Sequence, residues 1–324
     1  MATVTTHTKF HVQWHKAAKP AVIFSSALML LSFAMFFFNG FKLGLDFTGG
    51  AQLDVHYEQP ADINAIRTTL EGAHYEGVVV QLFGSAHDVT IRVPPQKHIA
   101  EIDAVDAVLA TLKEAEPTVK LLNKGSVGPS VGKDLIEDGF SAMAISFIGI
   151  LIYVALRYEL KFAAGAVLAL IHDVTITLGF FSLLGFEFDL TVIAAILTVI
   201  GYSLNDTVVV FDRMKENFIA LRNATPWEAA SNAINSMLVR TIVMTTTVII
   251  VLIALLIWGG PMLRNFSIAL LFGVGFGTYS SVYVATALAI GLGISREDLI
   301  PKKIEKEGAD QPNLVGGRFP PQQQ

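Results

Sequence analysis

Long runs of residues without any charge dominate this sequence. Four runs are uninterrupted, and two more are broken only by His172, Asp173 and Asp206. A helix needs about 20 consecutive apolar residues to cross the hydrocarbon core of a bilayer. The sequence therefore predicts a polytopic α-helical membrane protein with six transmembrane helices. The expected spans are 20–41, 139–156, 162–186, 190–211, 238–258 and 265–293.

Composition supports a membrane protein and narrows the chemistry. The 324 residues are 52% hydrophobic and 16% charged, with a mean hydropathy of +0.54, whereas soluble domains average about 25% charged residues. The chain has no cysteine, which excludes a disulfide scaffold, a thiol nucleophile and a cysteine metal site. The sequence contains no HExxH pair and no nucleophile signature. We therefore expect no enzymatic activity, no metal site and no cofactor.

The distribution of Lys and Arg predicts which side of the membrane each loop occupies. Lysines precede the first apolar run, but its 22 residues lack a small-residue cleavage site before Lys42, so we interpret it as an uncleaved span. Short cytoplasmic loops retain Lys and Arg, and the two short loops on the opposite side contain Arg264 alone. We therefore expect both termini in the cytoplasm, as an N-terminal tail at 1–19 and a disordered tail at 296–324.

The segment between the first two spans, 42–127, has the pattern of a small folded domain. Alternating apolar residues predict strands at 51–58, 77–83, 88–93 and 118–122. Helical spacing predicts one helix capped by Asp62 and another at 98–115. The order β-α-β-β-α-β is that of a ferredoxin-like α+β domain, followed by a linker at 128–138. Residues 42–138 contain 8 Lys and Arg against 15 Asp and Glu, which argues against nucleic acid binding.

Two ionisable residues within the predicted spans carry the most functional information. Asp206 lies well inside the fourth span, and Arg240 opens the fifth. Each costs roughly 2.5 to 3.5 kcal/mol at the bilayer centre on insertion scales. At a helical rise of about 1.5 Å per residue, both fall in the cytoplasmic half of the membrane and could meet. A purely structural ion pair is the alternative, but a buried pair seldom improves stability over apolar packing, which favours a functional role.

Asp206 and Arg240 form a candidate proton relay, and further polar residues accompany them. Hydrogen-bonding side chains flank the aspartate at Tyr202, Ser203, Asn205 and Thr207. Near the middle of the third span, Asp173 follows His172 and is either a second relay member or a partner for a polar helix face. Asp212 and Arg213 complete the polar set, and Arg213 lies two turns nearer the cytoplasm, where it is expected to extend to the interface.

Two other motifs have simpler interpretations. Gly273 and Gly277 form a small-xxx-small pair, which is typical of close helix packing in membranes. His7, His11 and His15 repeat every four residues, a spacing that could hold a metal on a helix. A solvated tail explains these histidines more simply.

The sequence resembles the SecD/SecF family of bacterial protein-export membrane proteins, on its SecF side, within the RND superfamily of proton-driven transporters. The matching segments are GLDFTGG at 44–50, GPSVG at 128–132, YVALRYE at 153–159, IHDV at 171–174, AAILTVIGYSLNDTVVVFDR at 194–213, RTIVMTTT at 240–247 and GTYSS at 277–281. These segments run in order through most of the chain, and the longest is highly specific.

The resemblance implies a function and a set of partners. The family's proton-linked Asp and Arg correspond to Asp206 and Arg240. The family motif in the periplasmic domain comprises Gly44, Asp46, Phe47, Gly49 and Gly50. The resemblance implies location in the bacterial inner membrane, with SecD, the SecYEG channel, a translocating preprotein and the lipid bilayer as partners. It further implies late translocation of preproteins driven by the proton-motive force, with the proton or sodium as coupling ion and no other cofactor.

Three alternatives stay open on the residues alone. A passive assembly subunit would use its polar residues only to hold SecD and SecF helices together. An RND-type small-solute exporter usually has larger outer domains than the single small domain expected here. An intramembrane aspartyl protease needs two facing aspartates, and Asp173 is the residue that could supply the second, but the GxGD signature is absent.

Overall fold

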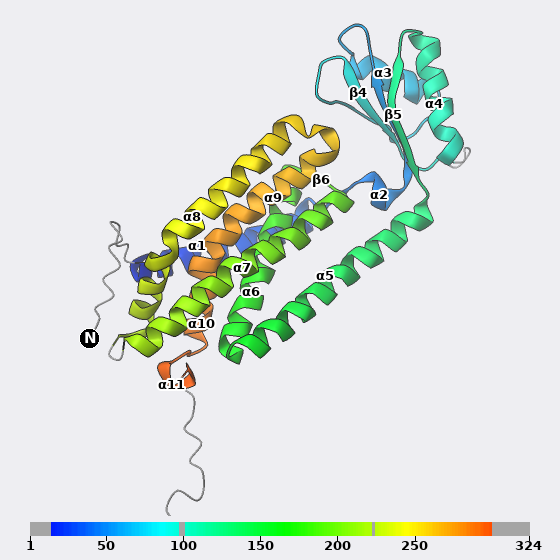
Figure 1. The fold of residues 1–324 in the computed structure, drawn as a ribbon. Helices are drawn as coiled ribbons and strands as arrows, with labels where there is room; N and C mark the ends of the chain where they lie inside the picture. The colour runs from blue at the N-terminus through cyan, green and yellow to red at the C-terminus, as the bar shows by residue number, and fades with distance from the viewer. Residues whose placement is uncertain (1–13, 97–100, 222–223, 300–324) are drawn as a thin grey trace, which may run out of the picture.

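The computed structural model describes residues 14–96, 101–221 and 224–299. They form a bundle of long helices with a small α+β domain at one end (Figure 1). Six helices in this part of the chain are long and apolar enough to cross a membrane, which confirms the predicted fold class. The start of α1 (Trp14–Phe38) and the short α11 (Arg296–Leu299) lie at the end of the bundle opposite the domain (Figure 1).

Helical hydrogen bonding continues past several of the predicted span ends. The spans are α1, α5 (Pro129–Arg157), α6 (Leu160–Leu184), α7 (Leu190–Ala220), α8 (Pro226–Trp258) and a rod made of α9 (Gly260–Ser280), the π-helical η1 (Ser281–Ala285) and α10 (Thr286–Gly291). Both α7 and α8 extend beyond the expected runs at 190–211 and 238–258. Thr225 Oγ1 accepts from Glu228 N at 3.3 Å, and the Glu228 carboxylate accepts from Thr225 N at 2.8 Å. This capping box explains why α8 begins so early.

Three helices form the centre of the bundle. About half of the most apolar stretch of α6, of α7 and of the rod that begins with α9 is buried, whereas α1, α5 and α8 leave most of theirs exposed. Fully buried large side chains of the centre include Phe162 and Phe181 on α6 and Ile196 and Phe211 on α7. An ionisable group on the inner face of these helices is therefore shielded from lipid by protein.

The α+β domain has the ferredoxin-like arrangement. Its elements are β2 (Gly50–His56), α3 (Ile63–Gly72), β3 (Val79–Leu82), β4 (Asp88–Val93), α4 (Glu101–Ala115) and β5 (Lys120–Val127). The strands form one antiparallel sheet in the order β3-β4-β2-β5, over a core in which Leu53 and Leu70 are fully buried. Asp62 caps α3 as predicted, because its carboxylate accepts from Asn64 N at 2.9 Å and Ala65 N at 3.2 Å.

The connection from the domain to the second span differs from the expectation. β5 extends to Val127, past the strand expected at 118–122, because it pairs along the whole of β2. α5 then begins at Pro129, so the expected linker at 128–138 is helical from its second residue onward. Proline favours the first turn of a helix, where its missing N–H has no intrahelical partner to lose. β5 therefore leads directly into a membrane-spanning helix.

Helical structure also enters the segments expected as tails. α1 begins at Trp14, inside the tail expected at 1–19, and α11 lies inside the tail expected at 296–324. The Asp298 carboxylate accepts from Lys161 Nζ at 2.8 Å, and this hydrogen bond holds the pKa of Asp298 below its ordinary value. The predictions for His7, His11, the side chain of His15 and residues 300–324 lie outside the described residues.

Candidate functional site

Asp206 lies on α7 where this helix meets α8 and α9. Only 4% of the residue is exposed. One hydrogen bond from the described residues reaches its carboxylate, in which Thr278 Oγ1 on α9 donates to Asp206 Oδ2 over a long 3.5 Å. Thr278 Oγ1 also lies 3.0 Å from Thr245 Oγ1 on α8, which accepts from the Tyr202 hydroxyl on α7 at 3.3 Å. Three helices thus present hydroxyl groups around one weakly bonded carboxylate.

Arg240 lies on α8, beside α7, but forms no ion pair with Asp206. Its side chain is exposed, and among the described residues no nitrogen–oxygen distance within 4.0 Å joins the two. The Arg240 charge still acts electrostatically on the Asp206 carboxylate. The structure therefore places the two predicted relay residues on neighbouring helices in an open arrangement.

The residues that flank Asp206 point to two different faces of α7. Thr207 is buried, and its Oγ1 lies 2.8 Å from Ser281 Oγ in η1, within the last membrane-spanning rod, which we call the last helix. Ser203 is buried as well, and its carbonyl accepts from the Ser281 hydroxyl at 3.2 Å. Asn205 is exposed on the other face. One face of α7 is therefore bonded into the bundle, and the opposite face offers a polar group to its surroundings.

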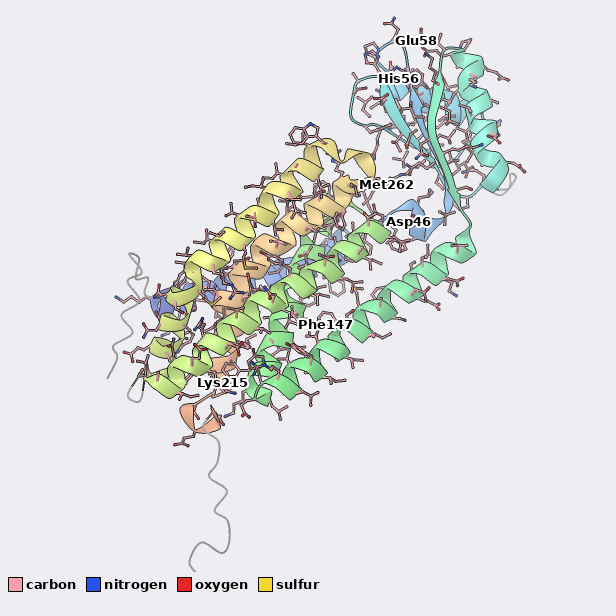
Figure 2. The ribbon with its side chains drawn as sticks, in the orientation of Figure 1. Asp46, His56, Glu58, Phe147, Lys215 and Met262 are labelled. Carbon is pink, nitrogen blue, oxygen red and sulfur yellow. The ribbon has the colours of Figure 1, made fainter. Side chains whose placement is uncertain are left out.

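Asp212 and Arg213 lie apart from this group. Asp212 pairs with Arg157 of α5 at 3.3 Å, and Arg213 pairs with Glu216 at 2.6 Å on the exposed surface of α7. This part of α7 lies near Lys215, at the end of the bundle opposite the domain (Figure 2). The positions of Asp212 and Arg213 therefore fit residues at a membrane boundary rather than residues that contact Asp206.

Asp173 has a much denser environment on α6. The residue is 1% exposed, and its Oδ2 accepts hydrogen bonds from Ser203 Oγ on α7 at 2.6 Å and from Ser280 Oγ on α9 at 2.7 Å. His172 Nδ1 lies 3.0 Å from Asp173 Oδ1. A single carboxylate thus links the three central helices.

Sequence reasoning missed the hydroxyl groups that complete both sites. They are Thr245 on α8 and Thr278, Ser280 and Ser281 on the last helix. Hydroxyl residues are common partners between membrane helices, so their presence in a span marks no site. The one signal in the sequence is that all four lie within the RTIVMTTT and GTYSS segments that carry the family resemblance.

The last helix changes its hydrogen bonding beside these residues. The π-helical η1 follows Ser280 directly. The hydroxyl oxygen of Ser281, its first residue, also lies 2.9 Å from the carbonyl oxygen of Gly277. π-helical turns are rare and occur frequently at functional sites. The irregular turn thus begins at the hydroxyls that contact α7.

Gly273 and Gly277 let α7 and α9 approach closely. A Cβ at Gly273 would clash with the Val199 side chain, and a Cβ at Gly277 would lie 3.1 Å from Ser203 Cβ. Small residues at such crossings allow helix backbones to approach in a membrane. This close approach is what brings Thr278 and Ser280 within reach of the two aspartates.

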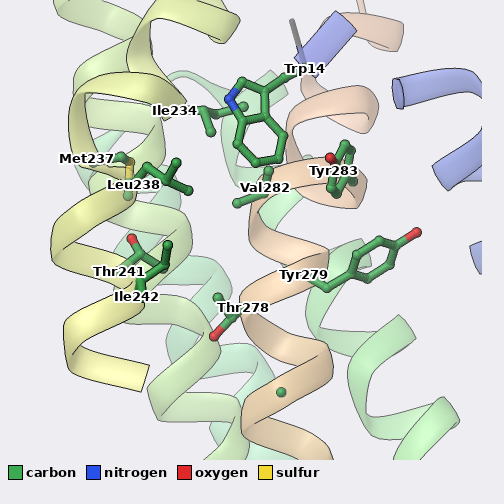
Figure 3. A pocket seen from close by; sticks show the side chains of 11 residues that line it. Trp14, Ile234, Met237, Leu238, Thr241, Ile242, Thr278, Tyr279, Val282 and Tyr283 are labelled. Carbon is green, nitrogen blue, oxygen red and sulfur yellow. The ribbon is translucent and has the colours of Figure 1, made fainter. Parts of the chain in front are cut away.

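An apolar groove opens beside the Asp206 site. It has a volume of about 310 Å³ and lies between α8 and the last helix, with Trp14 of α1 at one end (Figure 3). Ile234 and Thr241 line one wall, and Thr278 and Tyr283 line the other. Since Thr278 also bonds Asp206, its hydroxyl is the point where the groove meets the carboxylate.

The glycine-rich segment at 44–50 forms a joint between the α+β domain and the bundle. The short β1 (Lys42–Leu43) pairs in parallel with β6 (Glu187–Phe188), which lies between α6 and α7. Gly44 N donates to Phe188 O at 2.7 Å. A Cβ at Gly44 would lie 2.9 Å from a neighbouring side chain, so a larger residue would push the two segments apart.

Asp46 connects this joint to the start of α7. It lies on α2 (Leu45–Thr48), and its Oδ2 accepts from Leu190 N, the first residue of α7, at 3.0 Å. A carboxylate is favourable at a helix N-terminus, where it complements the helix dipole. Figure 2 shows Asp46 at the junction of domain and bundle. An ion pair between Arg92 of β4 and Glu187 of β6 adds a second connection from the sheet.

Phe47, Gly49 and Gly50 fix the rest of the motif. The Phe47 ring stacks on Phe188 with centroids 5.7 Å apart. Gly49 and Gly50 have φ angles of 71° and 119°, which glycine adopts without steric strain. A Cβ at Gly50 would also clash with the backbone of β4. The motif therefore places the edge of the domain against the connection between α6 and α7.

These geometries narrow the chemistry of the membrane site. Two carboxylates are buried among hydroxyl groups, an arrangement that suits the binding of a proton or a small monovalent cation. No group of three His, Asp or Glu side chains that could hold a metal occurs in the described part of the chain. Asp173 and Asp206 use different donors and share no hydrogen bond there, which argues against an aspartyl protease with two facing aspartates.

Family models match both parts of the chain. The model for the C-terminal part of protein export membrane protein SecD/SecF matches residues 107–294. The SecD/SecF GG motif matches residues 34–61. The first match covers the helices that carry Asp173 and Asp206, and the second covers the joint at 44–50.

Relatives of nearly the same length are similar throughout. Protein translocase subunit SecF of Vibrio alginolyticus is 44% identical over 300 residues, which cover 92% of this chain and 94% of that protein. Protein translocase subunit SecF of Escherichia coli O157:H7 is 42% identical over 302 residues, 90% of this chain and 91% of that protein. These relatives are named as components of a transport system, not as enzymes.

Solved structures agree with the sequence matches. SecDF of Thermus thermophilus, described as a translocon-associated membrane protein, superposes with a TM-score of 0.78 at 32% identity, over 90% of this chain and 39% of that chain. SecDF in a super-membrane-facing form superposes with a TM-score of 0.62 at 34% identity, over 85% of this chain and 38% of that chain. This chain thus spans about two fifths of the length of SecDF. On these matches, the chain belongs to the SecF side of the SecD/SecF family of protein export membrane proteins.

Proposed function

We propose that this chain is an ion-coupled subunit of the bacterial protein-export machinery, which works with SecD to promote late translocation of preproteins driven by the proton-motive force. The Asp206 carboxylate carries the proposal. It is buried in a membrane-spanning helix, receives one hydrogen bond of 3.5 Å from the described residues, and has Arg240 nearby without a closed ion pair. An ionisable group inside a span is costly, and such groups mark ion pathways.

Loading a cation at Asp206 would change the attraction between two helices. The ionised carboxylate attracts Arg240 of α8, and a bound proton or sodium ion cancels that attraction, so α7 and α8 favour a different relative position. One elementary charge that moves across about 100 mV gains roughly 2.3 kcal/mol. This energy shifts a two-state equilibrium by more than about tenfold, which is enough to drive a conformational cycle.

α7 provides a direct route from the ion site to the domain. Asp206 lies on the helix whose first N–H group binds Asp46. A movement of α7 along its axis would displace the joint, and the ion pair between Arg92 and Glu187 would carry that displacement into the sheet. We propose that the α+β domain uses this displacement to draw a preprotein outward.

The exposed polar residues beside the site favour a partner helix. Asn205 and Arg240 lie on the outer surface of α7 and α8, where contact with lipid would cost several kcal/mol. Polar groups from a neighbouring span would remove much of that cost. SecDF of Thermus thermophilus is a longer chain, of which this chain matches 39%. We propose that SecD covers this surface. We propose further that the resulting complex joins a translocon formed by the SecYEG channel.

The positions of charged residues support one orientation in the bacterial inner membrane. Arg157, Lys161 and Lys215 lie at or near helix ends opposite the α+β domain (Figures 1 and 2). Cytoplasmic loops retain positive charge. We therefore assign this end of the bundle to the cytoplasm and the domain to the periplasm.

The variant Asp206→Asn tests the proposal. Asparagine is nearly isosteric and can still accept the hydrogen bond from Thr278, but it cannot ionise. We expect the variant to insert and to co-purify with SecD, yet to lose the gradient-dependent stimulation of preprotein translocation into membrane vesicles. Asp212→Asn is the matched control, since this carboxylate lies on the same helix but pairs with Arg157 at its exposed end.

The outcomes separate the competing functions. Full stimulation by Asp206→Asn would overturn the proposal. Loss of SecD from the purified Asp206→Asn variant would instead support a passive assembly subunit. Gradient-driven efflux of small solutes from vesicles that contain the wild-type complex would support a solute exporter.

A further inference from the structure

We propose that His172 and Asp173 form a second proton-binding site, which holds one proton while Asp206 is ionised. The inference rests on the proposed function, because it adds a second carrier to the same ion path. It is carried by a separate observation, namely a histidine and an aspartate buried side by side among the three central helices. The ligand is a proton, and the site is distinct from Asp206 in its helix and in its hydrogen bonds.

The pair is shielded from solvent and from lipid. The side chains of His172 and Asp173 are 7% and 1% exposed. Asp173 Oδ2 accepts from two hydroxyl groups, those of Ser203 and Ser280, and neither of these donors carries a charge. His172, at 3.0 Å from Asp173 Oδ1, is the one group among the described residues that contacts the carboxylate and can become positive.

The elements packed against α6 supply no other positive charge at this level. The ionisable groups that they contribute within the membrane are Tyr153 on α5, Tyr202 and Asp206 on α7, Tyr279 on α9 and Tyr283 in η1, while α1 between Pro20 and Phe38 and α10 contribute none. Arg240 on α8 acts on Asp206. No lysine or arginine therefore compensates a charge on Asp173 in this part of the bundle.

Charge balance fixes the number of protons on the pair. Ionised Asp173 beside a neutral imidazole would leave a net negative charge in the interior, and imidazolium beside the neutral acid would leave a net positive charge. Either uncompensated charge costs several kcal/mol. One added proton makes the pair neutral as a whole. This count is the same whether the proton resides on His172 Nδ1 or on Asp173 Oδ1.

One nitrogen of the imidazole makes no hydrogen bond with the described residues. His172 Nε2 is buried and has no hydrogen-bond partner among the described residues. Buried polar atoms are normally satisfied, so a purely structural histidine would be expected to bond through both nitrogens. A ring with one unfixed nitrogen can accept a proton on one side and release it on the other, which suits transfer more than packing.

Ser203 brings the second site close to the first. Its hydroxyl donates to Asp173, and it lies about one helical turn before Asp206 on α7. Like charges repel in a low-dielectric interior, so ionisation of one carboxylate disfavours ionisation of the other. The pair therefore keeps its proton while Asp206 is ionised, and releases it more easily once Asp206 binds a cation. Such alternation moves protons one at a time through the bundle.

Infrared spectroscopy of the full chain in lipid nanodiscs tests the proton directly. Near neutral pH we expect either a protonated carboxyl stretch or an imidazolium ring band, each shifted in D₂O. The signal must vanish in Asp173→Asn. In Asp206→Asn, which mimics the neutralised carboxylate, it must persist at a lower amplitude. The inference would be overturned if the wild type showed a neutral histidine and if the only band lost in Asp173→Asn were that of an ionised carboxylate.

A second variant keeps the test decisive if Asp173→Asn does not fold. His172→Asn removes the imidazole but retains an amide that can donate to Asp173. The proton must then reside on the carboxyl group, so this variant should show a protonated carboxyl stretch. Absence of that stretch in folded His172→Asn would equally overturn the inference.

Gradient-driven proton uptake into vesicles that contain the full chain with SecD separates the two proposals. We expect Asp173→Asn to abolish uptake although its side chain can still accept hydrogen bonds from Ser203 and Ser280. Loss of uptake in Asp206→Asn together with the wild-type rate in Asp173→Asn would reject the second proton site and leave the proposed function intact. Absence of both proton and sodium uptake in the wild-type complex would reject the proposed function, while the spectroscopic result would still decide the protonation of the pair.

Discussion

The two buried aspartates of the central helices have opposite surroundings. Asp173 receives hydroxyl bonds of 2.6 and 2.7 Å and a histidine contact of 3.0 Å, whereas Asp206 receives one bond of 3.5 Å from the described residues. Asp173 lies among α6, α7 and α9, and Asp206 faces the boundary with the exposed α8. The firmly bonded carboxylate resists a change of partners, and the weakly bonded one changes them at small cost. Burial alone therefore does not show which carboxylate moves helices.

The largest expected effect comes from forcing the helices apart at both sites. A Cβ at Gly277 would lie 3.1 Å from Ser203 Cβ and 3.7 Å from Asp173 Oδ2. Gly277→Val should therefore separate α7 from α9 and destabilise the bundle by about 3 kcal/mol or more, at the upper end for overpacking, because contacts of both sites are lost. Thermal unfolding of the purified full chain measures this loss. Gly275→Val is the control, since a Cβ there has no neighbour within 4 Å. Equal melting temperatures for the two variants would contradict the packing role of Gly277.

A smaller effect is expected where one bond to Asp173 is removed. Ser203→Ala deletes the 2.6 Å hydrogen bond, and bonds to an ionised or ion-paired group contribute about 1.5–3 kcal/mol. The variant should unfold at a lower temperature than the wild type and still bind SecD. Asn205→Ala, on the exposed face of the same helix, should unfold like the wild type. The reverse order of stability would show that Asp173 is not a structural centre of the bundle.

A third variant tests the route from Asp206 to the domain. Asp46→Ala removes the carboxylate that accepts from the first N–H group of α7, while the N-cap Asp189 keeps its bond to Val192 N. Loss of a carboxylate at a helix N-terminus destabilises by about 0.3–1 kcal/mol. Asp206 and Asp173 keep their own partners, so we expect proton uptake to continue while stimulation of preprotein translocation falls. Asp62→Ala removes the N-cap of α3 and should leave the coupling unchanged. Parallel loss of uptake and stimulation in Asp46→Ala would contradict a joint that acts downstream of the ion site.

The smallest change in stability is expected at Asp206 itself. Thr278→Val removes the 3.5 Å bond to Asp206, which is at the limit of useful length. It also removes the 3.0 Å contact with Thr245 Oγ1, which keeps its bond from the Tyr202 hydroxyl. We expect less than about 0.5 kcal/mol of destabilisation, at the low end for a hydrogen bond, together with an altered rate of ion uptake. Thermal unfolding and vesicle uptake measure the two effects. A loss of stability equal to that of Ser203→Ala would remove the contrast between the aspartates.

The fold was predictable because its signals are local. Uncharged runs predicted the six spans, and alternation with a capping Asp62 predicted the order of the ferredoxin-like domain. The cost of an ionisable group in lipid singled out Asp206 and Arg240 without any knowledge of packing. The helical extension of α8 and the helical start of α5 at Pro129 escaped prediction, because hydropathy reports only the part of a helix that lies in the membrane.

The chemistry around the aspartates was not predictable from one sequence. Which hydroxyl faces a carboxylate depends on how each helix is rotated, and rotation follows from close contacts such as Gly273 against Val199. Thr278 and Ser280 are therefore indistinguishable from other polar residues of their span until the helices are packed. The open position of Arg240 likewise depends on the spacing of α7 and α8, which no local pattern encodes.

Ion uptake into sealed vesicles that contain the full chain with SecD is the most direct test of the central claim. An imposed proton or sodium gradient should drive uptake by the wild type and by Asp212→Asn, while Asp206→Asn should remain at the rate of empty vesicles. Uptake by Asp206→Asn at the wild-type rate would show that the weakly bonded carboxylate on α7 does not carry the coupling ion.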